Sequence, residues 1–332
     1  MKKSEKRLLI AAGVVTIGAL GFAASSYLLT KKMVQIALER DVVKDTPENE
    51  KKKNQLRGYA EPAEYIQAVR DGKTYLEEAE TEMVQLDSYD GTPLTGHYFP
   101  VENPKRLIIA MHGWRSSWGQ DFGPIAKFWH DSDCSVLFCD QRGQGLSGGE
   151  YMGFGLTERH DCVEWVRLMQ QREPNLPIYL AGVSMGAATV LMAANLGIED
   201  VVHGIIADCA FTSPHAIWKH VVESNLRMSY GIIGRIADDM CRKTIQIGSR
   251  DVSTVDAMKE NKIPILFIHG TDDHFVPVEM TYENYKACSA PKRLLVIPGA
   301  DHGMCYYYDK NEYERKILNF FRDFDIASAE AE

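Results

Sequence analysis

A serine stands between two glycines where an apolar run meets a helix-forming run, within residues 178–196. A chain that turns sharply from a strand into a helix needs a strained residue at the turn and small neighbours where the two elements nearly touch. Gly182 and Gly186 meet that need around Ser184. The turn also places the hydroxyl at a helix N-terminus, where backbone N–H groups favour negative charge. The pattern predicts Ser184 as a nucleophile, and the alternative is a serine that only caps the following helix.

A nucleophilic serine needs a base to take its proton and a carboxylate to orient that base. A later, fully apolar run at 264–270 is typical of a strand buried on both faces of a parallel sheet, and the run 293–299 is expected to form another short strand. The first leads into Asp272 and Asp273, and the second leads into His302. The order serine, aspartate, histidine along the chain is the order expected of a triad on an α/β-hydrolase sheet.

Other histidines compete with His302 for the role of base. His112 and His269 each end an expected strand immediately before a glycine, so a tight turn accounts for them. His274 directly follows the aspartate pair and would have to fold back on it. His302 is therefore the predicted base.

Four segments resemble motifs of the α/β-hydrolase superfamily, and the resemblance covers about residues 82–324. They are the Gly-x-Ser-x-Gly turn, the strand-like run 107–111 with the following His-Gly-Trp, the Asp-x-Arg-Gly-x-Gly-x-Ser-x-Gly loop at 140–148, and the His-Gly-x-x-Asp-x-x-Val-Pro run at 269–277. The chain looks most like the exported, single-anchor bacterial serine hydrolases that carry S33-type serine aminopeptidase domains.

This resemblance implies roles for particular residues. The 269–277 pattern selects Asp273 over its neighbour Asp272 as the acid, and the Gly-x-x-His-Gly of 299–303 makes His302 the base. It implies a two-step acyl transfer in which Ser184 attacks an ester or amide carbonyl and water then releases the acid.

An oxyanion hole needs two fixed N–H donors, for which backbone groups are best suited. The residue after the nucleophile, Met185, is one expected donor, and the resemblance implies Trp114 as the other. The chain has His-Gly-Trp-Arg where many lipases have His-Gly-Gly-Gly. Trp114 and Trp118 are either pocket residues or packing aromatics in a long loop, and the Arg142 loop is expected to be a structural turn beneath the site.

Strands and helices alternate along the chain, which predicts the α/β class: an α/β-hydrolase fold with a mostly parallel eight-stranded sheet and helices on both faces. A hairpin is expected at 82–86 and 94–99, around Asp90-Gly91. Further strands are expected near residues 107, 136, 178, 205, 265 and 294, with helices at 157–171, 187–196 and 312–324. In the family the insertion at 213–249 carries a small helical cap, whose apolar residues either shape an acyl pocket or pack on the main domain.

The N-terminal stretch 8–30 has 23 residues without a charge and lies between basic clusters at 2–7 and 31–32. As a helix it would be about 34 Å long, enough to cross a bilayer core of roughly 30 Å. The domain organisation predicted is a membrane anchor or signal sequence at 1–32, a tether at 33–81 with short helices at 63–69 and 74–83, and the hydrolase domain at 82–326.

Ala23 and Ser25 offer small residues for signal-peptidase cleavage, but the apolar stretch continues past them and is long for a signal sequence. We therefore expect an uncleaved, single-pass anchor in the cell membrane. A short basic N-terminus usually stays inside. The hydrolase domain is then expected to be extracytoplasmic.

The formal net charge of −9 argues against a nucleic-acid partner. The seven cysteines are odd in number and several lie in apolar runs, so no essential disulfide is expected. No cofactor and no metal are expected. The predicted function is a serine hydrolase acting on a small-molecule ester or amide, most like an esterase. An aminopeptidase-type peptidase, an acyltransferase with the same triad and a non-catalytic membrane-anchored binding protein are the alternatives, and the oligomeric state stays open.

Overall fold

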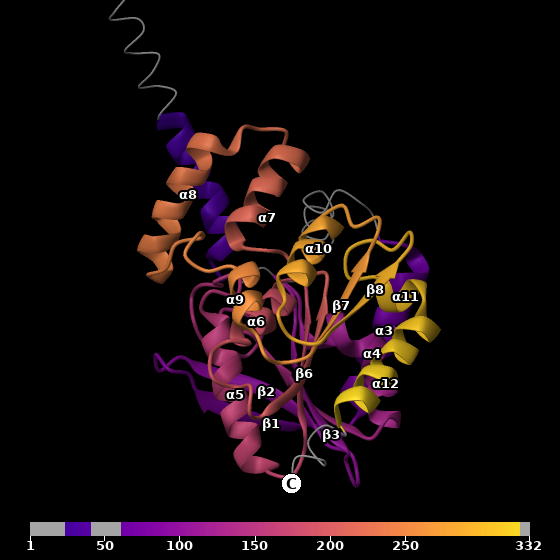
Figure 1. Ribbon diagram of the computed structural model, residues 1–332. Coiled ribbons are helices and arrows are strands. Elements are labelled where there is room, and N and C mark those ends of the chain that lie inside the picture. Colours follow the sequence, from indigo (N-terminus) through magenta and orange to yellow (C-terminus); the bar gives the residue numbers. More distant parts are fainter. Residues whose placement is uncertain (1–23, 41–60, 326–332) are drawn as a thin grey trace, which may run out of the picture.

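One mixed sheet forms the centre of the computed structural model, which describes residues 24–40 and 61–325. The eight strands follow the order β1-β2-β4-β3-β5-β6-β7-β8 (Figure 1). The pairs β1–β2 and β2–β4 are antiparallel and all others are parallel, as the sequence predicted for an α/β-hydrolase sheet. The strands are β1 (Glu82–Asp87), β2 (Pro93–Phe99), β3 (Arg106–Met111), β4 (Cys134–Cys139), β5 (Ile178–Val183), β6 (Val202–Asp208), β7 (Ile265–Gly270) and β8 (Lys292–Ile297).

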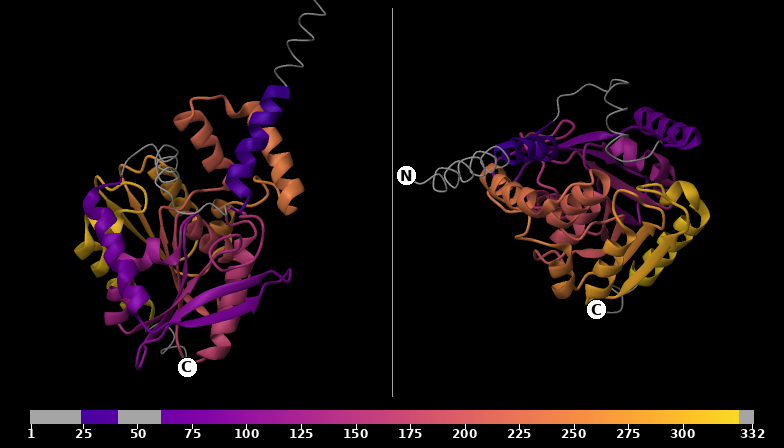
Figure 2. Two further views of the ribbon diagram at one scale, coloured as in Figure 1. Left: turned by 180° about the vertical axis from the view of Figure 1, so that it is seen from behind. Right: turned by 90° about the horizontal axis from the view of Figure 1, so that it is seen from above.

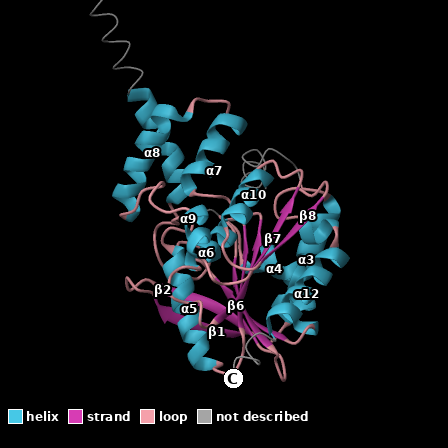
Figure 3. Ribbon diagram, viewed as in Figure 1, coloured by secondary structure: helices cyan, strands magenta, loops and turns pink. Residues whose placement is uncertain are grey.

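Helices cover both faces of the sheet, so the central strands are buried on both sides (Figure 3). Side chains of β3 alternate between the two faces: Leu107 and Ile109 pack in one apolar cluster, and Ile108 and Ala110 pack in the other. The helices are α3 (Ala63–Glu78), α4 (Trp118–Asp131), α5 (Glu158–Arg172), α6 (Met185–Ala193), α7 (Pro214–His220), α8 (Tyr230–Ile245), α9 (Thr254–Glu260), α10 (Val278–Ala287), α11 (Cys305–Tyr308) and α12 (Lys310–Asp325), with a π-helical turn at Val221–Asn225.

The helix α3 corrects the prediction of two short helices at 63–69 and 74–83. The two predicted segments are joined through Gly72, and the second ends before β1 begins at Glu82. Gly72 lies against Gly123 of α4, where an added Cβ would come within 2.2 Å of the Gly123 carbonyl carbon. The glycine that weakens the helical pattern in the sequence is therefore what lets α3 approach α4.

The helix α4 was not predicted, and it also places Trp118 in a helix instead of a loop. It contains Gly119, Gly123 and Pro124, all of which disfavour a helix interior. Ser117 caps its N-terminus by accepting from the Gln120 N–H at 3.3 Å. Trp118 stacks on His97 with ring centroids 4.4 Å apart, so it is a packing aromatic on the sheet.

The cap predicted at 213–249 consists of α7, the π-helical turn and α8, which stand above the carboxyl ends of the parallel strands (Figure 1). Residues 24–38 form a further helix, here called the N-terminal helix. Figures 1 and 2 show it lying alongside α7 and α8. Its Val34 and Leu38 are buried in one apolar cluster with Met185 of α6 and Ile217 of α7. Part of the segment predicted as a tether is thus packed in the cap.

Most of the predicted membrane anchor, residues 8–23, lies outside the described residues. Its last residues, 24–30, form the beginning of the N-terminal helix. Within 24–40 and 61–325, no helix has both the length and the apolar character needed to span a bilayer.

Candidate active site

Ser184 stands at the sharp turn between β5 and α6. Its backbone has φ 56° and ψ −115°, a strained combination for a residue with a side chain. An added Cβ on Gly182 would come within 2.4 Å of the Gly186 carbonyl carbon, and one on Gly186 within 1.8 Å of the Met111 carbonyl oxygen. The two glycines are therefore required by the close approach of β5, α6 and β3, as the motif predicted.

The structure brings together the three residues that the sequence predicted from distant segments. His302 Nε2 lies 2.9 Å from Ser184 Oγ, and His302 Nδ1 lies 2.7 Å from Asp273 Oδ2. With the proton on Nδ1, the imidazole donates to the carboxylate and accepts from the serine hydroxyl. The serine is 7% exposed, and the side chain of Asp273 is fully buried.

Asp273 is held as an anion by four neighbours. Its Oδ1 accepts from the backbone N–H groups of Phe275 and Val276 at 2.9 and 2.8 Å. Its Oδ2 lies 3.0 Å from Nε2 of the buried His269, in addition to the contact with His302. Burial alone would raise the pKa of Asp273, but the two histidines, through charge and hydrogen bonds, hold it well below its usual range. The carboxylate is thus ionised at neutral pH despite its burial.

The other candidates for the acid and the base have different partners. Asp272 is exposed and accepts from the hydroxyl of Thr271 at 2.7 Å. His112 is buried, where its Nε2 accepts from the Gln141 N–H at 3.2 Å. His274 is exposed and pairs with Asp301 at 3.1 Å. Among these candidates, the structure joins His302 and Asp273 to the serine.

The loop after β3 passes directly beside the serine. An added Cβ on Gly113 would lie 3.4 Å from the Ser184 Cβ. The Gly113 N–H donates to Asp121 Oδ2 at 2.6 Å, so α4 fixes this loop. Trp114, one predicted oxyanion donor, follows Gly113, and Met185, the other, is the first residue of α6. Met185 is thus bonded directly to Ser184, and Trp114 is one residue from the glycine that passes beside it; oxyanion donors must lie in this region.

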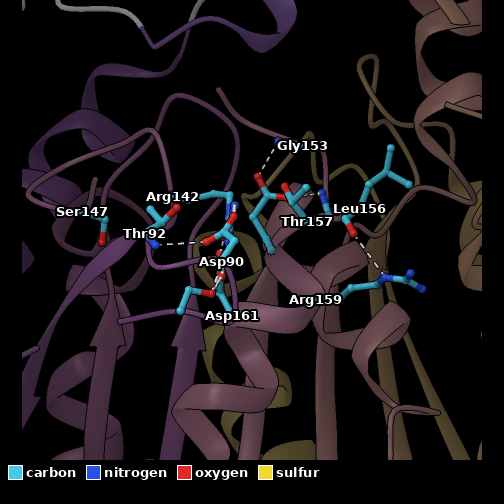
Figure 4. A network of polar contacts seen from close by, with 12 residues as sticks. Asp90, Thr92, Arg142, Ser147, Gly153, Leu156, Thr157, Arg159 and Asp161 are labelled. Carbon is cyan, nitrogen blue, oxygen red and sulfur yellow. Dashed lines mark hydrogen bonds and ion pairs between the residues drawn. The ribbon is translucent and has the colours of Figure 1, made fainter. Parts of the chain in front are cut away.

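The Arg142 loop is held by a buried ionic network, drawn in Figure 4. The Arg142 guanidinium contacts both carboxylate oxygens of Asp161, at 2.6 and 2.5 Å, and lies 2.8 Å from Asp90. Burial alone would raise the pKa of Asp90, but hydrogen bonds from Arg142 and Thr92 lower it to about 2. The preceding residue, Gln141, binds His112 through its backbone N–H. Through the contact between Gln141 and His112, the network thus helps to hold the end of β3 in place. It does not contact Ser184.

Cys209, Asp273 and His302 are the one cluster in the described part of the chain whose ligand atoms lie close enough to hold a metal ion, within 4.8 Å of one another. Burial raises the pKa of the Cys209 thiol well above its usual value, so the sulfur is protonated. A metal there would also displace the Asp273–His302 hydrogen bond. The donor set therefore fits the hydrogen-bonded chain better than a metal.

Three features of the site were missed by the sequence analysis. They are His269 as a second partner of Asp273, Asp121 as the support of the Gly113 loop, and the N-terminal helix above the site. The His-Gly motif contained the first, since His269 lies four positions before Asp273. No local signal indicated the other two, because they depend on tertiary packing.

Comparisons with known proteins agree with this fold. The family model described as serine aminopeptidase, S33 matches residues 102–262. The uncharacterized protein YqkD of Bacillus subtilis is 26% identical over 248 residues, which cover 74% of this chain and 80% of that protein. Human monoglyceride lipase is 33% identical over 117 residues, 34% of this chain and 38% of the lipase. Among solved structures, the Pyrococcus furiosus esterase Pf2001 superposes with a TM-score of 0.62 at 20% identity, covering 74% of this chain and 92% of that chain.

The fold and these similarities define an α/β hydrolase. Within that superfamily, residues 102–262 resemble the S33-type serine aminopeptidases, and the similarities identify the chain as a hydrolase enzyme. A small-molecule substrate is consistent with this family.

The Arg142 network leads to a prediction about stability. Arg142→Ala leaves the buried Asp161 without its countercharge, and removal of one partner of a buried pair costs about 3–5 kcal/mol. We expect the free energy of unfolding, measured by urea denaturation, to fall by about that amount. Arg315→Ala, which removes an exposed pair with Glu312, is the control and should change it much less. Equal losses in the two variants would contradict a structural role of the Arg142 network.

Proposed function

We propose that the protein is a serine hydrolase that cleaves a carboxylic ester through an acyl-enzyme, with Ser184 as nucleophile, His302 as base and Asp273 as orienting acid. The observation that carries the proposal is the continuous chain of hydrogen bonds from Ser184 through His302 to Asp273. These three groups stand in the mutual contacts that the chemistry requires.

In the first step His302 Nε2 takes the proton of Ser184 as Oγ attacks the carbonyl carbon. Asp273 stabilises the imidazolium that forms, and the N–H groups of Met185 and Trp114 bind the developing oxyanion. The imidazolium gives its proton to the leaving oxygen as the tetrahedral intermediate collapses. His302 then removes a proton from water as the water attacks the acyl carbon. The imidazolium returns this proton to Ser184 Oγ as the bond between Oγ and the acyl carbon breaks, which releases the acid and restores the enzyme.

The comparisons offer support for two kinds of acyl bond, an ester and an amide. The esterase titles of structural neighbours and the similarity to monoglyceride lipase support an ester, whereas the serine aminopeptidase description of the family supports an amide. An acyltransferase would use the same residues with an alcohol or amine in place of water. Comparing short-chain esters with aminoacyl amides, with and without added alcohol, separates these reactions.

We also propose that residues 8–30 anchor the enzyme in the cell membrane with the hydrolase domain outside the cytoplasm. The uncharged sequence of this stretch supports the anchor. At the start of the N-terminal helix, Tyr27, Leu28 and Leu29 are exposed apolar side chains. Such a patch is typical of contact with a membrane or a partner.

Replacing the nucleophile tests the reaction. Ser184→Ala should lower kcat for a short-chain ester by about 10⁶-fold, because the hydroxyl that becomes the acyl carrier is removed. A fluorophosphonate probe should label the wild-type protein and fail to label the variant. Near-normal turnover by the purified variant would overturn the assignment, and a wild-type protein that the probe does not label would favour a binding protein.

The two neighbouring aspartates provide a matched pair of variants. Asp273→Asn removes the carboxylate that orients His302, and a loss of about 10⁴-fold in kcat is expected. Asp272→Asn changes an exposed residue, so its kcat should stay within about twofold of the wild-type value. A larger loss at Asp272 would reverse the choice of acid.

The anchor is tested with the full-length protein in cells. We expect it to remain in the membrane fraction after an alkaline carbonate wash and to be digested by protease added outside intact spheroplasts. Intact mass should show an uncleaved N-terminus. Release by the wash, or cleavage near Ala23 to Ser25, would contradict the anchor, and protection from protease would contradict the orientation.

A further inference from the structure

An apolar cavity of about 190 Å³ lies between the cap and the N-terminal helix. An engineered apolar cavity of about 150 Å³ stays dry and binds benzene, so this one has room for an apolar group of similar or larger size. Three walls enclose it. The N-terminal helix contributes Met33, Val34 and Ala37, among others, and α7 and α8 contribute residues that include Ile217 and Ala237.

The inner end of the cavity adjoins the candidate active site. Trp114 and Phe275 line it there. Trp114 belongs to the loop beside Ser184, and the Phe275 ring packs against the His302 ring with centroids 5.1 Å apart. These two residues therefore connect the surroundings of Ser184 and His302 with an apolar space that has almost no polar lining.

The N-terminal helix is a fixed wall, because each of its last four carbonyl groups has a partner. Gln35 O accepts from the N–H of Glu39 within the same segment, at 2.9 Å. Ile36 O accepts from Arg115 at 2.6 Å, and Ala37 O accepts from the Trp114 indole N–H at 2.9 Å.

Leu38 O accepts from the Met152 N–H at 2.6 Å. The carbonyls at a helix C-terminus otherwise need water or a cap. Two of the four partners, Arg115 and Trp114, come from the loop that runs beside the serine. The end of the helix and the proposed oxyanion loop are thus joined directly.

A second cavity, of about 410 Å³, lies next to Val183 and Gly303 between α3, α4 and the C-terminal helices. Asp71, Asp121 and Asp208 contribute to its lining. Burying methylene groups against carboxylates gains little, so this cavity is a poor site for an acyl chain.

We propose that the cavity under the cap is the acyl-chain site of the enzyme, and that the N-terminal helix is the wall that determines which chains are accepted. The site takes an apolar acyl group of several carbons. This proposal rests on the proposed ester hydrolysis at Ser184. It adds a segment far outside the catalytic motifs to the residues that determine substrate specificity.

The experiment uses the full-length protein and p-nitrophenyl esters of acetate, butyrate, hexanoate and octanoate. Each buried methylene contributes about 0.8 kcal/mol, so kcat/KM of the wild type should rise about fourfold per methylene until the cavity is filled. Ala37→Phe on the N-terminal helix and Ala237→Phe on α8 fill the cavity from opposite walls. In each, the ratio of kcat/KM for octanoate to that for acetate should fall at least tenfold.

Lys32→Phe is the matched control, because it puts the same ring on the same helix at an exposed position that does not line the cavity. Its chain-length profile should equal that of the wild type. Thermal unfolding and the fraction of protein labelled by a fluorophosphonate probe verify that each variant is folded and has a reactive serine.

The outcomes separate the two proposals. Suppose that the probe labels the wild type but kcat/KM does not depend on chain length, or that both filling variants keep the wild-type ratio of kcat/KM for octanoate to that for acetate. The proposed acyl-chain site is then wrong, and the proposed hydrolase function still stands. If Ala237→Phe alone changes the ratio, the cavity is the acyl site but the N-terminal helix does not determine specificity. If the wild type neither reacts with the probe nor turns over any ester, the proposed function itself fails.

Discussion

The close approach of β3, β5 and α6 is the constraint on which the rest of the site depends. Gly186 leaves no room for a Cβ against the Met111 carbonyl, and Gly182 leaves none against Gly186. This contact holds Ser184 in a strained turn and brings the loop after β3 beside it. Because β7 and β8 run parallel to β5, their carboxyl ends deliver Asp273 and His302 to the same edge of the sheet. The hydrogen-bonded chain is a consequence of this topology.

Elements with local signals were predicted well from the sequence. Each of the strands β3–β8 is an apolar run, and the turn at Ser184 combines a motif with a strand and a helix. In contrast, α4 was missed because Gly123 and Pro124 lower its intrinsic helix propensity. It exists because its apolar face packs on the sheet and its Gly123 receives α3. In α4, tertiary packing outweighs the low helix propensity of the segment. No pattern within the segment's own sequence indicates this packing.

The candidate site shows the same division. Ser184 and His302 follow from motifs, and the geometry of Asp273 agrees with the family pattern. Its electrostatics could not be predicted from the sequence, because they come from His269 and from two backbone N–H groups that only the folded loop directs at one carboxylate. These contacts are what keep a buried acid ionised. The sequence therefore names the candidate reacting groups, while the fold determines whether they have the charges that the proposed reaction needs.

The N-terminal helix is the largest departure from the expected domain organisation. An uncharged stretch followed by a charged segment resembles an anchor followed by a tether with short helices, since nothing in its own sequence indicates where it packs. In the structure its Val34 and Leu38 share an apolar cluster with Met185, the residue after the serine. Its C-terminal carbonyls are bound by Arg115 and Trp114, so loss of the helix would remove these hydrogen bonds beside the proposed oxyanion loop. The N-terminal helix is therefore packed as part of the hydrolase domain, and the proposed acyl-chain site lies within the same packed unit.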